Sequence, residues 1–219
     1  MRLIFVVGPA RSGTSAVCEL LSRMGVDELP PTVGGDHNPH YHENLVINAL
    51  AEAIHPWHKV DEPYLNPHFW EAMASYILEG CGKKESIMLK SPVFPFITPQ
   101  LEKVAAMIDE VLEEDVEPWW VRVHRNGKAT ALSQTSFTNG VWSTSHWAEV
   151  TRQAHRIADA NVGLDKQCIH VDYEDLLADW RQVALQLDKI PGTILPADGG
   201  IRPELNHYNE GVGYARKAV

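Results

Sequence analysis

Cysteine is scarce in this 219-residue sequence, and so are basic residues and long apolar runs. The three cysteines, Cys18, Cys81 and Cys168, follow no metal-binding or redox spacing, so we expect reduced thiols in a cytoplasmic protein. No apolar run approaches the length that spans a membrane, and residues 1–7 are too few for the apolar core of a signal peptide. The 19 Lys and Arg against 29 Asp and Glu give a formal charge of −10, which argues against non-specific binding to nucleic acid.

The composition itself is that of a globular protein, 44% hydrophobic and 22% charged, and the length suits one domain over residues 1–219. Short apolar runs alternate with segments of helical periodicity. We predict strands over residues 3–7, 86–90, 119–124 and 168–171. Helices are predicted over 14–24, 43–54, 67–78, 98–112 (with Thr98 as cap), 127–137, 147–158 and 173–189. Residues 27–42 and 55–66 are expected to be loops, and residues from about 190 to 219 an irregular tail. This alternation predicts an α/β fold of the P-loop type, in which a mostly parallel central sheet lies between two layers of helices.

The first predicted strand runs directly into a glycine loop and a helix, an arrangement that binds anions through loop amides and the helix dipole. Gly8 and Gly13 have the spacing of an ATP-binding P-loop. The position of the P-loop lysine, however, is occupied by Thr14, and the nearest cation is Arg11 inside the loop. The loop therefore predicts an anion site that is poorly suited to ATP hydrolysis.

Two further cations follow predicted strands in the same way. Lys90 ends the strand near residue 86, and Arg125 follows the strand that ends at residue 124. Ligands of parallel sheets bind beyond the carboxyl ends of the strands, so Arg11, Lys90 and Arg125 are expected to converge on one pocket.

Several segments together resemble the sulfotransferase family, which uses 3′-phosphoadenosine-5′-phosphosulfate (PAPS) as donor. Residues 8–15 (GPARSGTS) are similar to the family's loop for the 5′-phosphosulfate, and Arg125 and Ser133 have the Arg-x7-Ser spacing of its 3′-phosphate site. Residues 171–177 (VDYEDLL) resemble a segment after a late strand of the family. Residues 38–43 (NPHYHE) and 88–92 (MLKSP) are similar to acceptor-side segments, although a glycine is missing from the first and Ser91 replaces an acidic residue in the second.

The resemblance implies transfer of a sulfuryl group from PAPS to a hydroxyl or amine, with release of adenosine 3′,5′-bisphosphate (3′,5′-ADP). It places Arg11 beside the sulfuryl group, Arg125 and Ser133 at the 3′-phosphate, and Tyr173 near the adenine. The amides expected to hold the 5′-phosphate are those of Ser12, Gly13, Thr14 and Ser15. The tail is expected to fold over the nucleotide.

On the acceptor side, Glu43 aligns with the family's catalytic glutamate and is one candidate for the general base. His37, His40 and His42 compete for this role because a histidine titrates in the useful range. Lys90 is either a second cation that stabilises the transferring group or a lysine that only extends from the end of a strand toward solvent. The histidines are accompanied by no Cys pair or His-Glu-x-x-His motif, so we expect no metal.

The acceptor itself is left open as a small molecule, a carbohydrate or a peptide. Trp57, Trp70 and Trp142 are candidates for lining its pocket, with core packing as the alternative for each. Two other functions also stay open: an ATP-dependent small-molecule kinase, and a nucleotide-binding protein without catalysis.

Overall fold

The structure is a computed structural model, and it describes residues 1–35, 38–59, 66–113, 115–162 and 167–199. Five strands form one sheet in the order β2-β5-β1-β6-β7, and every neighbouring pair is parallel. Their bounds are β1 Arg2–Val7, β2 Asp27–Glu28, β5 Ser86–Lys90, β6 Glu117–His124 and β7 Cys168–Asp172. β1 lies at the centre because its apolar residues are buried on both faces of the sheet, as the continuous run from Leu3 to Val7 requires.

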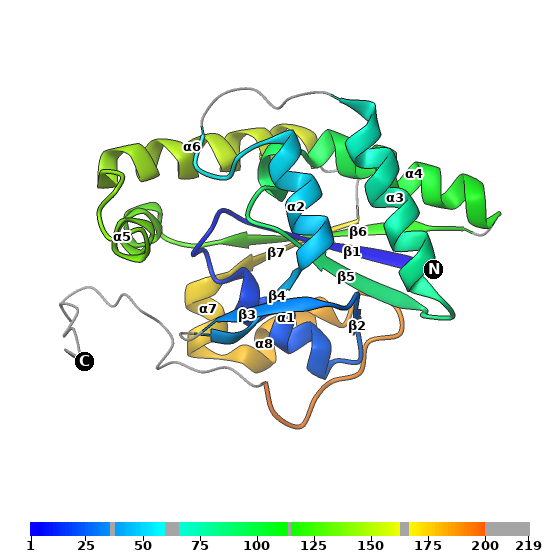
Figure 1. Cartoon of the computed structure of the whole chain (residues 1–219). Coiled ribbons are helices and arrows are strands. Elements are labelled where there is room, and N and C mark those ends of the chain that lie inside the picture. Colours follow the sequence, from blue (N-terminus) through cyan, green and yellow to red (C-terminus); the bar gives the residue numbers. More distant parts are fainter. Residues whose placement is uncertain (36–37, 60–65, 114, 163–166, 200–219) are drawn as a thin grey trace.

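Helices cover both faces of this sheet (Figure 1). One layer holds α2 Leu45–Ile54, α3 Pro67–Cys81, α4 Thr98–Leu112, α5 Gly127–Phe137 and α6 Thr144–Asn161, together with the short 3-10 helix η1 Phe94–Phe96. The opposite layer holds α1 Thr14–Arg23, α7 Tyr173–Ala178 and α8 Trp180–Leu187. Each layer has its own apolar cluster against the sheet. The predicted three-layer α/β/α fold with a mostly parallel sheet is therefore confirmed.

The prediction of a loop over residues 27–42 is wrong. Besides β2, this region contains the antiparallel pair β3 Thr32–Gly35 and β4 Asn38–Asn44. The sequence here is rich in Pro, Gly and His and lacks the alternation of apolar and polar residues that predicts a strand. The strands are defined by backbone hydrogen bonds, which side-chain hydrophobicity does not reveal.

The helix after β4 begins two residues later than predicted. The side chain of Asn44 caps α2, since its Oδ1 accepts hydrogen bonds from the backbone N–H groups of Val46 and Ile47, both at 2.9 Å. Glu43 consequently lies on a strand and not in the helix.

Other helix boundaries also differ from the prediction, among them the start of α4 and the division of the last predicted helix. Ile97 is the residue before α4, and Thr98 is the first residue of the helix and not its cap. The helix predicted over 173–189 is two helices, because Asp179 leaves the helical conformation and accepts a hydrogen bond from Arg181 N at 3.1 Å to cap α8. The tail residues from 200 onward lie outside the described part. Within that part, no helix is both long and apolar enough to cross a membrane.

Candidate functional site

The carboxyl ends of the parallel strands bring the predicted cations to one edge of the sheet. After β1 the chain first builds β2 and β5 on one side, and only later β6 and β7 on the other. The loop after β1 therefore lies where the strand order reverses, which is the usual ligand crevice of an open α/β sheet.

The glycine loop between β1 and α1 is tightly enclosed. A Cβ at Gly8 would lie 2.6 Å from Ser12 Oγ and 2.9 Å from the Val123 carbonyl oxygen, so no larger residue fits. Gly13, which precedes α1, has φ 97°, and a Cβ there would lie 2.1 Å from the Tyr173 ring. Ser12 is completely buried, and its Oγ has no hydrogen-bond partner among the described residues. A buried donor of this kind at a helix N-terminus suits an anion.

Two arginines lie at this loop, Arg11 within it and Arg125 in contact with it. Arg125 Nη1 donates to the carbonyl oxygen of Arg11 at 2.8 Å, and its guanidinium lies 4.9 Å from the centre of the Tyr173 ring. Arg11, itself at φ 66°, donates from Nε to the Oγ of the buried Ser133 at 3.3 Å. Burial raises the pKa of Tyr173, and the two arginines oppose that shift. Four of the residues singled out in the sequence, Arg11, Arg125, Ser133 and Tyr173, thus lie together at the glycine loop.

A lysine and a carboxylate form a second group at the same edge. Lys90, at the end of β5, has a side chain that is only 4% exposed. Its Nζ donates to Glu43 Oε1 at 2.7 Å and to Ser15 Oγ at 3.0 Å. Since Ser15 belongs to the first turn of α1, this ammonium group links β4 to the helix that follows the glycine loop.

His42 lies next to Glu43 in the sequence but contacts different groups. Its Nδ1 is 2.6 Å from Glu28 Oε1, and its Nε2 is 3.4 Å from Glu19 Oε2. Both ring nitrogens therefore face carboxylates of β2 and α1, with the His42 backbone at φ 56°. Of the other candidate bases, His37 and the side chain of His40 lie outside the described residues.

Gln134, which the sequence analysis missed, and Glu174 support this edge. Gln134 Nε2 donates to the carbonyl oxygen of Ala10 at 2.9 Å, which holds the glycine loop against α5. Glu174 accepts a hydrogen bond from Asn126 N at 3.2 Å and so ties α7 to the turn before α5. Gln134 is nearly fully buried, and its only sequence signal is its place beside Ser133. Glu174 lies in the segment after β7 that the sequence analysis singled out.

A cluster of three histidines lies beside the site, on β6, β7 and α6. The His124 ring stacks on His155 with centroids 5.4 Å apart and on His170 at 5.2 Å. Burial, aided by the nearby Arg122 and His124, lowers the pKa of His155 to about 4. In the described ranges, no group of three or more His, Cys, Asp or Glu side chains is arranged to hold a metal ion.

Comparisons with known proteins identify the family and the fold. A family model described as "Sulfotransferase family" matches residues 3–189. The sulfotransferase domain of an olefin synthase from Synechococcus PCC 7002 superposes with a TM-score of 0.51 at 19% identity, covering 86% of this chain and 72% of its own. A sulfotransferase from Alicyclobacillus acidocaldarius gives 0.52 at 15% identity, covering 92% and 87%. At these identities the two structures show the fold alone. No curated protein sequence matches significantly.

The family model spans most of the chain, including the glycine loop, Lys90 and the segment from Arg125 to Ser133. The chain therefore belongs to the sulfotransferase family, whose members are sulfuryl-transferring enzymes.

Proposed function

We propose that this protein transfers a sulfuryl group from PAPS to a hydroxyl or amine acceptor and releases 3′,5′-ADP. The observation that carries the proposal is that hydrogen bonds link Arg11 of the glycine loop to both Ser133 and Arg125. The same loop has threonine at the position of the P-loop lysine. One loop can hold one phosphate, and a second arginine–serine pair nearby suits a nucleotide with a further phosphate.

The residues present fit such a donor. The buried Ser12 Oγ and the glycine cradle suit an anion at the N-terminus of α1, where the amides of Ser12, Gly13, Thr14 and Ser15 would hold the 5′-phosphate. In this proposal Arg125 and Ser133 bind the 3′-phosphate, and Tyr173 contacts the adenine. PAPS supplies the activated sulfuryl group.

The remaining polar groups supply charge and a base. Arg11 and Lys90 are fixed cations, placed to stabilise negative charge on the transferring group without a divalent metal. We assign Glu43 as the general base that accepts the acceptor's proton, because it aligns with the family's catalytic glutamate and its carboxylate lies 2.7 Å from Lys90, the cation that we assign to the transferring group. His42 is the weaker candidate, because both its ring nitrogens face Glu28 and Glu19.

The cellular setting belongs to the same proposal. Cys18, Cys81 and Cys168 are all free thiols, and two of them are buried. Free thiols suit the reducing cytoplasm, where we place the protein.

The test is formation of 3′,5′-ADP from PAPS in the presence of EDTA, with a mixture of phenol, alcohol and amine acceptors. The wild type should release 3′,5′-ADP, and Glu43→Gln should reduce the rate by about 100-fold or more. Glu52→Gln, an exposed glutamate on α2, is the matched control and should be unchanged. Equal rates for Glu43→Gln and wild type would remove Glu43 as the base. Release of ADP from ATP only with Mg²⁺ would instead indicate a kinase.

A further inference from the structure

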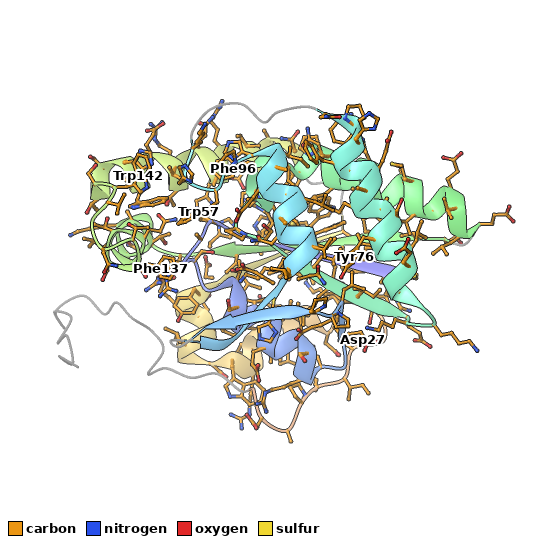
Figure 2. All side chains as sticks on the ribbon, viewed as in Figure 1. Asp27, Trp57, Tyr76, Phe96, Phe137 and Trp142 are labelled. Carbon is orange, nitrogen blue, oxygen red and sulfur yellow. The ribbon has the colours of Figure 1, made fainter. Side chains whose placement is uncertain are left out.

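The last residue of α5 and the turn that follows it expose several large apolar side chains. Phe137 is 48% exposed, Val141 74% and Trp142 39%, all within six consecutive residues. Figure 2 shows Phe137, Trp142 and Trp57 on the side of the molecule where the strands of the sheet end. The candidate site lies on that same side.

The exposed indole of Trp142 is held in a fixed orientation by other rings. It stacks on His58 with centroids 5.5 Å apart and on His146 at 4.7 Å, with interplanar angles of 22° and 23°. The ring of His146 also makes a 2.9 Å hydrogen bond to the carbonyl oxygen of His58. The segment after α2 and the start of α6 are thereby joined through aromatic contacts.

A second stack anchors this arrangement to the core. Trp57 lies 5.0 Å from Trp147 at an interplanar angle of 12°, and Trp147 is fully buried. Trp57 is only partly buried, so it extends the aromatic core toward the surface. Ring faces that are fixed before a ligand arrives lose little conformational entropy on binding.

Phe137 connects these rings to the proposed donor site. The Arg11 guanidinium lies 5.1 Å from the centre of the Phe137 ring, while its Nε donates to Ser133. The same arginine that we place beside the sulfuryl group thus borders the exposed aromatic side chains.

We propose that Trp57, His58, Phe137, Trp142 and His146, here called the aromatic platform, bind the acceptor, and that the acceptor is a planar aromatic alcohol. This inference rests on the proposed function, because it assigns the substrate class to the same site. Phe137 and Trp142 remain 48% and 39% exposed beside these contacts, so part of a phenyl and of an indole ring is open to a flat aromatic ring. None of its five side chains is a carboxylate or an amide, and Nε2 of His146, which could otherwise pair with a sugar hydroxyl, is already bonded to the His58 carbonyl oxygen.

The experiment is calorimetric titration of the full chain with 2-naphthol, with and without saturating 3′,5′-ADP. Decahydro-2-naphthol, the saturated alcohol of the same carbon skeleton, and methyl glucoside are the comparison ligands. We expect 2-naphthol to bind at least about tenfold more tightly than either of them.

Variants locate the binding. Trp142→Leu should weaken 2-naphthol about tenfold and leave the affinity for 3′,5′-ADP unchanged, and Trp142→Phe should retain most of the binding. Trp180→Leu is the matched control, since Trp180 lies on α8 in the opposite helix layer.

Several results would overturn the proposal. Equal affinity for the flat and saturated alcohols, or equal binding by Trp142→Leu and wild type, would contradict the platform. Tighter binding of methyl glucoside would contradict the aromatic class. Failure of 3′,5′-ADP to bind would count against the proposed function instead, and the titration without nucleotide would still test the platform.

Discussion

Replacing Arg125 by alanine should separate the binding of two nucleotides that differ only in the 3′-phosphate. A hydrogen bond between charged groups contributes about 1.5–3 kcal/mol, so the affinity for 3′,5′-ADP should fall by roughly 10- to 150-fold from this contact. Arg125 also donates a hydrogen bond to the Arg11 carbonyl oxygen at 2.8 Å. This bond holds the glycine loop, so its loss should weaken the binding of both ligands equally. Because the donor is charged, loss of this bond costs at most about 1.5–3 kcal/mol, and the cost is the same for both ligands. The affinity for 5′-AMP should therefore fall by this share alone, and that for 3′,5′-ADP by roughly 10- to 150-fold more.

The assay is calorimetric titration of the variant with 3′,5′-ADP and with 5′-AMP at one salt concentration. Arg125→Lys retains the charge but loses the planar fork, and it should recover only part of the loss. Arg181→Ala is the matched control, because Arg181 is an exposed arginine at the start of α8 that stacks on Trp180. Equal losses of affinity for 3′,5′-ADP and 5′-AMP in Arg125→Ala would refute the assignment of Arg125 to the 3′-phosphate.

Three further perturbations test the site and its surroundings. Gly13→Ala should abolish nucleotide binding and lower the melting temperature, because the new Cβ would lie 2.1 Å from the Tyr173 ring; an unchanged melting curve would contradict the close packing. Lys90→Met should reduce the rate of sulfuryl transfer about 100-fold in single-turnover assays and change 3′,5′-ADP affinity little, whereas an unchanged rate would remove Lys90 from the reaction. As the pH falls from 6.5 to about 4, the free energy of unfolding should decrease by at most about 3 kcal/mol because of His155. In that pH range His155 binds a proton in the unfolded chain but not in the folded chain. His155→Leu should flatten this slope in urea unfolding, and an identical slope would contradict the lowered pKa.

Four of the five strands of the sheet and the convergence of the cations were accessible from the sequence, whereas β2 was missed. The apolar run from Leu3 to Val7 leads into the glycine loop and so predicts a buried strand, and parallel strands bring Arg11, Lys90 and Arg125 to one edge of the sheet. The spacing of Gly8 and Gly13 likewise predicted an anion-binding loop after the first strand.

The neighbourhood of Glu43 was less predictable. The β3–β4 pairing rests on backbone hydrogen bonds, and the helical periodicity of the following residues continued back across the Asn44 cap. On the strand, His42 contacts Glu28 and Glu19, while Glu43 contacts Lys90. Two adjacent candidates for one role thus face different partners, as successive side chains of a strand do.

The aromatic platform could not be predicted because its members are distant in the sequence. His58 and Trp142 are brought together only by the packing of the α2 and α6 segments. The sequence left Trp57 and Trp142 open between the core and an acceptor pocket. In the structure Trp57 lies at the edge of the core, and Trp142 is exposed.

The central claim is that the glycine loop binds a 3′-phosphorylated nucleotide without metal, and competitive titration tests it most directly. 3′,5′-ADP, 5′-AMP and ATP are each titrated into the wild-type protein by calorimetry, once with EDTA and once with Mg²⁺. We predict that 3′,5′-ADP binds most tightly and that its affinity is the same in both conditions. Tighter binding of ATP with Mg²⁺ than of 3′,5′-ADP would contradict the account.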